Sequence, residues 1–304
     1  MPQLRLGTRG SPLALTQAHM VRDALCARHG MSSDTIEIVV VRTTGDKVQD
    51  RALAEIGGKA LWTKELDRAL LNEEIDFAVH SMKDVETIRP VDIAIAAMLE
   101  RADMRDRIIG ADSVDSLPQG ARVGTSSPRR AAQLRYLRPD ISILLFRGNV
   151  DTRLAKLASG EADATLLAAA GLERLNRPDV GTPVPIDTML PAPAQGAVGI
   201  ECRAEDAAMR DLLAAIDHAP TSRCVRAERA LLAALGADCH SPVAALATEN
   251  EARVHLRAML YAGDGSERVA GEASAGIGDT GFAGALARDL LNRAPPAIRS
   301  LFAG

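Results

Sequence analysis

The sequence predicts an α/β protein whose C-terminal part changes to an α+β pattern, and three observations support this fold class. Over the first two-thirds of the chain, short apolar runs alternate with amphipathic helical patterns, which is typical of helices layered on a largely parallel sheet. A connection rich in Pro, Ala and Gly, PAPAQGAVGIE, precedes the change to alternating strand patterns. The length of 304 residues is too great for one ordinary core and suits two or three domains.

Strands are expected where short apolar segments lie between turn residues. These segments are Leu4–Gly7, Ile36–Val41, Ile75–His80, Asp92–Met98, Arg122–Gly124, Ile141–Phe146, Ala162–Leu167 and Ala197–Glu201. The clearest helix spans Pro12–His29, because Ser11 suits the N-cap, Pro12 the first helical position and Gly30 the position after the end. Further helices are expected over 60–72 and 205–217.

Three domains are expected, with a boundary near Ala219. Domain 1 comprises residues 1–99 with 194–217, domain 2 comprises 100–193, and domain 3 comprises 218–304. The first two are interpreted as periplasmic-binding-protein-like α/β domains with a cleft between them. Domain 3 is the smaller α+β domain, with helices near 221–235 and over 281–292 and an alternating strand over 253–260.

Composition and cysteine spacing exclude several classes of function. Aromatic residues make up 2% of the chain and the net charge is −4, which leaves little for stacking or attracting nucleic acid. The four cysteines have no CxxC spacing and the six histidines have no ligand spacing, which argues against a disulfide framework or a metal site. The N-terminus lacks the pattern of a signal peptide and no segment is apolar enough for a membrane span, so a cytoplasmic protein is expected.

Cationic and hydroxyl side chains follow four of the expected strands. They lie in the segments 8–11, 80–84, 125–130 and 147–149, and ligands of α/β sheets gather at such strand ends. Arg129 and Arg130 would lie in the first turn of a helix capped by Ser127, where cations oppose the helix dipole and so suggest an anionic ligand. The arginines expected to converge on one cleft are Arg9, Arg129, Arg130, Arg147 and Arg153.

Two further residues are candidates for chemistry. Asp84 could be a helix cap, an ion-pair partner of Lys83, or an acid/base or cation-stabilising carboxylate in the arginine-rich cleft. His80, in contrast, is better interpreted as a core residue at the end of an apolar strand. Cys239 is expected in an exposed loop, either as a nucleophile or as the attachment point of a prosthetic group; His240 is a poor base for it, because adjacent side chains of an extended loop point apart.

Eight ordered segments carry a resemblance to a known family. They are TRGSPLAL, GGKALWTKEL, AVHSMKDV, GTSSPRRAAQL, FRGNVDTRLAKL, AAAGLERL, PAPAQGAVGIECR and the loop with Cys239. Throughout its length the chain resembles the porphobilinogen deaminase family, also called hydroxymethylbilane synthases. The resemblance implies a monomeric transferase of porphyrin and heme biosynthesis that condenses four porphobilinogen molecules head to tail with loss of ammonia. It also implies a covalent dipyrromethane cofactor.

The resemblance assigns roles to individual residues. It implies a thioether to the cofactor at Cys239 and a proton-transfer and cation-stabilising role for Asp84. The remaining cofactor contacts that it implies are Ser81, Lys83, Thr125, Ser126, Ser127, Arg129, Arg130, Arg147, Gly148 and Arg153. The substrate contacts that it implies are Arg9, Ser11, Lys59, Trp62, Arg147, Arg153, Arg174 and Gln195.

The sequence departs from the family pattern at two places, and two other functions are alternatives to this interpretation. Glu55 stands where similar members often have Lys, which leaves Lys59 as the basic residue of that loop, and Ala237-Asp238 stands where Gly-Gly usually precedes the cysteine. One alternative is a two-domain anion-binding protein without catalysis. The other is a cysteine hydrolase, which would need a distant histidine and an oxyanion hole.

Overall fold

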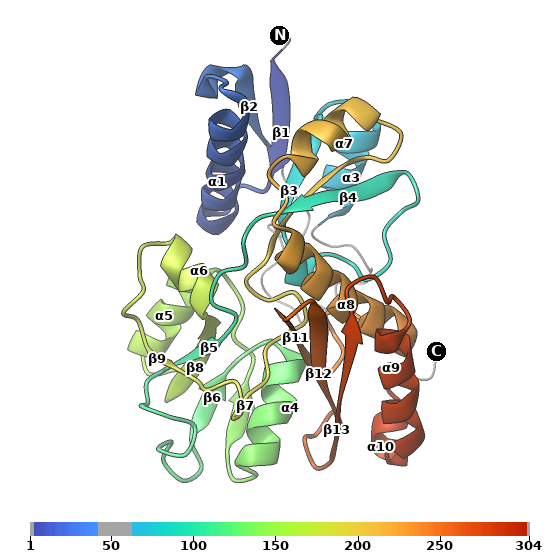
Figure 1. Ribbon diagram of the computed structural model, residues 1–304. Helices are drawn as coiled ribbons and strands as arrows, with labels where there is room; N and C mark the ends of the chain where they lie inside the picture. Colours follow the sequence, from blue (N-terminus) through green and yellow to red (C-terminus); the bar gives the residue numbers. More distant parts are fainter. Residues whose placement is uncertain (1–2, 42–62, 303–304) are drawn as a thin grey trace. The chain divides into compact units, whose positions relative to one another are not determined.

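The computed structural model describes residues 3–41 and 63–302, and the chain forms two compact units (Figure 1). The first unit comprises Met1–Ala102 and Gly196–Ser222, and the second comprises Asp103–Gln195 and Arg223–Gly304. Among the described residues, each unit contains one five-stranded mixed sheet, and the second also carries a three-stranded sheet.

The sheet of the first unit has the strand order β2-β1-β3-β10-β4. The bounds are β1 Leu4–Thr8, β2 Ile36–Val40, β3 Phe77–Ser81, β4 Ile93–Met98 and β10 Val198–Arg203. Strand β1 pairs in parallel with β2 and β3, whereas β10 runs antiparallel between β3 and β4. The chain therefore leaves this sheet after β4 and returns with β10, which inserts between β3 and β4.

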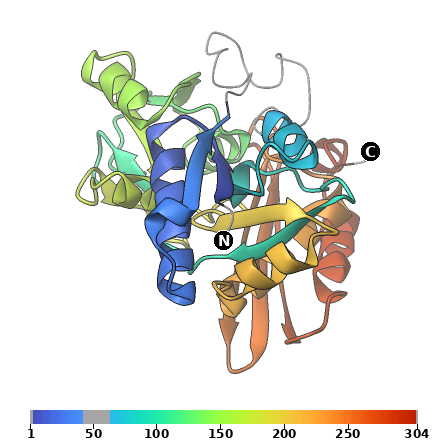
Figure 2. The same ribbon diagram turned by 90° about the horizontal axis from the view of Figure 1, so that it is seen from above.

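Helices cover both faces of this sheet, as the alternation of side chains along β3 requires. Phe77 packs in one cluster with Leu25 of α1 (Pro12–His29), and α7 (Ala207–Ala214) joins the same cluster. Ala78 packs in another cluster with Leu66 of α3 (Lys64–Leu71). Figure 2 shows α1 and α3 on either side of the strands.

The sheet of the second unit repeats this topology with the order β7-β6-β8-β5-β9. The bounds are β5 Asp106–Ile109, β6 Arg122–Gly124, β7 Ser142–Leu144, β8 Ala164–Ala168 and β9 Thr182–Pro183, with helices α4 Pro128–Leu137, α5 Val150–Ala158 and α6 Ala169–Arg174. Strand β6 pairs in parallel with β7 and β8, and β5 is the antiparallel strand between β8 and β9. The loops after β6 and β7 consequently open at the same edge of the sheet.

The C-terminal region is an antiparallel meander covered by helices, which confirms the α+β pattern. Its elements are β11 Val243–Asn250, β12 Arg253–Tyr261, β13 Arg268–Gly276, α8 Ala219–Leu235, α9 Phe282–Arg293 and α10 Pro296–Arg299. Leu231 of α8, Leu256 of β12 and Leu290 of α9 are fully buried in one cluster. Figure 1 shows α9 beside β13.

The expected elements agree with the structure apart from their ends and a few omissions. Helix α1 begins and ends where the sequence indicated: Ser11 Oγ accepts a hydrogen bond from the Ala14 amide at 3.3 Å, and Gly30 ends the helix at φ 64°. The strand expected over 141–146 is shorter, and the helix expected over 205–217 spans 207–214. Strand β5 was not expected, because Asp106 and Arg107 interrupt its apolar pattern.

Candidate active site

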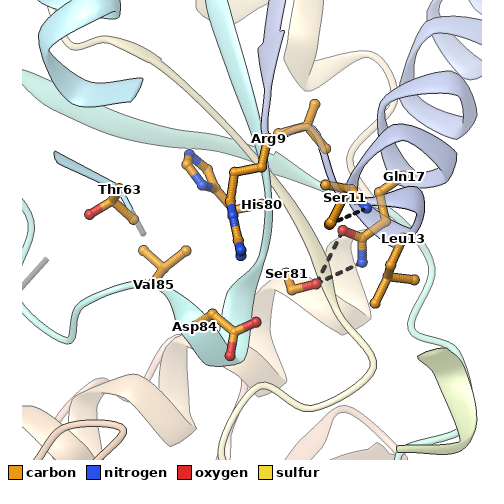
Figure 3. Close-up of a pocket in the computed structure, with 11 residues that line it drawn as sticks. Arg9, Ser11, Leu13, Gln17, Thr63, His80, Ser81, Asp84 and Val85 are labelled. Atoms are coloured by element: carbon orange, nitrogen blue, oxygen red, sulfur yellow. Dashed lines mark hydrogen bonds between the residues drawn. The ribbon is translucent and has the colours of Figure 1, made fainter. Parts of the chain in front are cut away.

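A cavity in the first unit lies at the end of β3, and Asp84 lines it (Figure 3). Its volume is about 430 Å³, including the space that opens to solvent. The residues that line it are Arg9, Ser11, Leu13, Ala14, Gln17, Thr63, Val79, His80, Ser81, Asp84 and Val85. The structure thus brings together the residues predicted after the first and third strands.

Asp84 is the last residue of a 3-10 turn, η3 (Met82–Asp84), that follows β3 directly. Met82 is buried beneath Gly199 of β10, where any Cβ would collide with its sulfur, so this glycine permits the turn to pack closely. The Asp84 side chain is half-buried, and within residues 3–41 and 63–302 it forms neither an ion pair nor a hydrogen bond. Neither a helix cap nor an ion pair with Lys83 therefore explains this carboxylate.

Arg9 and Ser11 flank the cavity from the loop between β1 and α1. In Figure 3 the guanidinium of Arg9 points toward the side of the cavity where Asp84 lies. Ser81, opposite, is contacted by Gln17 of α1, whose Nε2 donates to the Ser81 hydroxyl at 2.8 Å. Gln17 was not among the predicted site residues, although a polar residue on the buried face of an amphipathic helix was a signal for it.

Behind the cavity, His80 contacts a buried group of charges. His80 Nε2 lies 3.1 Å from Oε2 of Glu201, a fully buried residue of β10. Arg89 donates to both oxygens of this carboxylate, at 2.8 and 2.9 Å, and also pairs with Asp67 and Glu86. Burial alone would raise the pKa of Glu201, but His80 and Arg89 outweigh it and lower the pKa to about 2.

In the second unit, Arg129 and Arg130 surround a buried carboxylate, that of Asp106. Arg129 Nη2 donates to Oδ2 at 2.7 Å, and Arg130 donates to Oδ1 through Nε at 3.2 Å and Nη2 at 2.7 Å. Gln195 Nε2 donates to the same Oδ1 at 2.9 Å. Burial opposes ionisation of Asp106, but the two guanidinium groups prevail and hold its pKa well below the ordinary range. The two arginines at the start of α4 thus have an internal counter-ion, Asp106, which the sequence did not reveal.

Two arginines of this unit have buried N–H groups without a hydrogen-bond acceptor among the described residues. Arg129 Nε is buried and lacks a hydrogen-bond partner among the described residues. Arg147, 8% exposed, lies in the loop after β7, and within the same part of the chain its Nη1 also has no acceptor. A buried guanidinium nitrogen without an acceptor is costly, so both atoms indicate where an anionic group would bind.

The neighbouring loop residues are held by local contacts. Arg153 donates from Nε to the carbonyl of Gly148 at 3.0 Å, and its Nη2 lies 3.4 Å from the hydroxyl of Ser126. Gly148 has φ 106°, and a Cβ there would lie 2.7 Å from Thr152 Cβ, so the turn requires glycine. The hydroxyls of Thr125 and Ser127 accept backbone amides, and Arg174 lies at the end of α6.

Cys239 is the exposed member of the four cysteines, on the loop between α8 and β11. The left-handed residue after α8 is Gly236, at φ 63°, so Ala237 and Asp238 need no positive φ. Asp238 Oδ1 instead accepts the amide of His240 at 2.8 Å, and the Asp238 amide donates to the hydroxyl of Ser241 at 3.1 Å. The departure from Gly-Gly is therefore accommodated by a turn that Asp238 itself stabilises.

Three of the residues singled out in the sequence lie outside the described part of the chain, and that part contains neither a metal-binding cluster nor a membrane-spanning helix. Glu55, Lys59 and Trp62 lie outside the described residues. Within 3–41 and 63–302, no group of three or more His, Cys, Asp or Glu side chains could hold a metal ion. Over the same ranges, no helix has the length and apolarity needed to cross a membrane.

Comparisons with known proteins give one family for the whole chain. Residues 4–211 match the family model described as porphobilinogen deaminase, dipyromethane cofactor binding domain, and residues 222–291 match porphobilinogen deaminase, C-terminal domain. A porphobilinogen deaminase of Sphingopyxis alaskensis is 60% identical, covering 99% of this chain and 96% of that protein. One from Paracoccus denitrificans is 51% identical, covering 96% and 95%.

Solved structures of periplasmic binding proteins are more distant. A Salmonella typhimurium periplasmic binding protein with high arginine specificity is 13% identical, covers 73% of this chain and 94% of its own, and has a TM-score of 0.40. A Silicibacter pomeroyi protein of the His/Glu/Gln/Arg/opine-binding family, in complex with lysine, is 16% identical, with 70% and 88% coverage and a TM-score of 0.38.

Proposed function

Because the chain belongs to the porphobilinogen deaminase family, we propose that it condenses four porphobilinogen molecules head to tail into the linear tetrapyrrole hydroxymethylbilane, releasing ammonia. The observation that carries this proposal is the half-buried carboxylate of Asp84, which lines a cavity and has no partner among the described residues. Loss of ammonia leaves a positive charge on a pyrrole ring. A fixed carboxylate beside that ring stabilises the charge as it develops.

The dipyrromethane cofactor of the family fits the residues of the second unit. Its acetate and propionate groups require cationic donors, and Arg129 Nε and Arg147 Nη1 are buried donors without an acceptor in the described chain. When bound, this cofactor supplies the pyrrole to which new units are added. We assign Arg129, Arg130, Arg147 and Arg153 to its carboxylates, with Asp106 holding the first two in place.

Cys239 is proposed as the thioether attachment point. Its exposure supports this, because a thiol must be accessible to react, whereas Cys202 is buried and burial raises its pKa to about 11. The hydrogen bonds of Asp238 to His240 and Ser241 form a turn around this cysteine. None of the four cysteines forms a disulfide bond within the described part of the chain, which supports action in the cytoplasm.

Arg9 and Ser11 are proposed to bind the carboxylates of the incoming substrate. Both line the cavity with Asp84, and the guanidinium of Arg9 points toward the Asp84 side (Figure 3). A cation and a carboxylate in one cavity suit a substrate that has carboxylate arms and becomes cationic at the ring. An anion-binding protein without catalysis would use the cation alone.

The test is incubation of purified protein with porphobilinogen, followed by measurement of ammonia and of pyrrole products by mass spectrometry. We expect one ammonia for each unit consumed and a linear tetrapyrrole as the product. Reversible binding of porphobilinogen without ammonia would support the anion-binding alternative and contradict the proposal. Asp84→Asn should nearly abolish ammonia release.

A further inference from the structure

His80 occupies a position that a core residue alone does not explain. It is the fourth residue of β3, between Val79 and Ser81, and it lines the same cavity as Asp84. The side chain is 5% exposed, so the imidazole is almost fully enclosed yet borders the cavity. In Figure 3 the ring lies on the far side of Arg9 from Gln17 and Ser11. A buried imidazole facing a ligand cavity can exchange a proton with a bound ligand.

The carboxylate behind His80 is held rigidly. Glu201 lies on β10, the antiparallel neighbour of β3, and Arg89 contacts both of its oxygens. Burial opposes ionisation of Glu201, but the two hydrogen bonds and the charge of Arg89 favour it, whether or not His80 carries a proton. Glu201 is therefore ionised at neutral pH, and an ionised oxygen 3.1 Å from Nε2 favours a proton on that nitrogen.

Charged side chains of the described residues lie on two sides of His80. Behind the ring, three carboxylates (Asp67, Glu86 and Glu201) surround the single guanidinium of Arg89, an excess of two negative charges with His80 neutral. On the cavity side lie the cation Arg9 and the carboxylate Asp84. Thr63, also at the cavity, contributes a hydroxyl and no charge. An imidazole that gained a proton would thus have the carboxylate oxygen of Glu201 3.1 Å from its Nε2.

We propose that His80, positioned by Glu201, accepts the proton that each condensation releases. This inference rests on the proposed function. In each step one C–N bond breaks, and its electron pair leaves with the ammonium nitrogen as ammonia. One C–C bond forms, and the C–H bond at the attacking carbon breaks. The hydrogen of that bond passes as a proton to the unprotonated nitrogen of His80, and the imidazole later returns it to water.

This assignment gives the two acid/base groups of the cavity different tasks. Asp84 opposes the positive charge that forms when ammonia departs, for which it must keep its own charge. His80 removes the proton after the new bond has formed. A single carboxylate performing both tasks would lose its negative charge whenever it held the proton.

The kinetic test compares His80→Gln with His255→Gln. His255 is a matched control, since it also lies on a strand and has Glu272 at 3.5 Å, but on the exposed C-terminal sheet. Glutamine can still donate to Glu201 but cannot accept the proton, so kcat should fall about 100-fold or more with little change in KM. With porphobilinogen deuterated at its free ring carbon, the isotope effect on kcat should be larger in His80→Gln than in wild type.

An unchanged kcat and isotope effect in a folded His80→Gln variant would overturn the inference. It would leave the proposed function intact as long as the wild type still releases ammonia and makes the tetrapyrrole. A wild type that makes no tetrapyrrole would instead contradict the proposed function itself.

A second measurement requires neither turnover nor a folded variant. In the full-length protein labelled with ¹⁵N histidine, the ring nitrogen shifts report which nitrogen of neutral His80 carries the proton. We expect the proton on Nε2, which faces Glu201. A proton on Nδ1 would overturn the inference, because the nitrogen needed to accept the released proton would then be occupied.

Discussion

Arg130 donates two hydrogen bonds to one carboxylate oxygen of Asp106, through Nε at 3.2 Å and Nη2 at 2.7 Å. Arg129 contacts the other oxygen at 2.7 Å, so one buried aspartate holds two buried arginines at the start of α4. Two guanidinium groups beside the helix N-terminus would otherwise repel one another and the helix dipole. The negative charge of Asp106 thus allows two arginines to be buried at the start of this helix.

Asp106→Asn should destabilise the protein severely. The change leaves two buried cations without a counter-ion, which costs about 3–5 kcal/mol of unfolding free energy. The measurement is urea unfolding followed by circular dichroism. Asp163→Asn is the matched control, because Asp163 pairs with Arg122 at the surface, and it should leave the midpoint unchanged. Equal midpoints for Asp106→Asn and wild type would refute the structural role of Asp106.

Arg147→Leu should have the opposite effect to Asp106→Asn: the protein should remain as stable as wild type but should lose bound cofactor. Arg147 Nη1 is buried without an acceptor among the described residues, so leucine removes a desolvation cost. In a Cys239→Ala background we expect the melting temperature to stay equal or to rise. In the Cys239 protein we expect less bound cofactor or shortened chains by mass spectrometry. Arg122→Leu, a change at an exposed arginine, is the control and should retain the normal mass distribution.

Glu201 should contribute to acid unfolding in a defined pH window. Its pKa is lowered from 4.5 to about 2 on folding, so the unfolded chain binds this proton more tightly than the folded protein. The resulting stabilisation is present above about pH 4.5 and is lost as the pH falls toward 2. Glu201→Gln should flatten the dependence of unfolding free energy on pH in this window. Glu272→Gln, at an exposed partner of His255, should leave it as in wild type.

The parts of this protein that follow local rules could be predicted from the sequence. Helix α1 was expected correctly at both ends, because Ser11, Pro12 and Gly30 act within a few residues of those ends. The position of Asp84 directly after an apolar strand was visible in the sequence in the same way. The cavity then brought it together with Arg9, as the rule for strand ends implies.

The parts that depend on partners distant in the chain could not be predicted. Asp106 follows no apolar run, and its partners lie more than 20 residues further on in a helix. Glu201 meets His80 only because β10 inserts between β3 and β4, in a sheet whose other strands precede it by about 100 residues or more. Ion pairs between residues distant in the sequence depend on the order of strands in the sheet, which neither composition nor periodicity indicates.

The intact mass of the purified protein tests the central claim most directly. If this chain builds tetrapyrroles on a dipyrromethane bound to Cys239, wild type and Asp84→Asn should both exceed the sequence mass by one dipyrromethane, and Cys239→Ala should have the bare sequence mass. Brief exposure of wild type to porphobilinogen should add further units in steps. A wild type at the bare sequence mass with full tetrapyrrole synthesis would contradict the account.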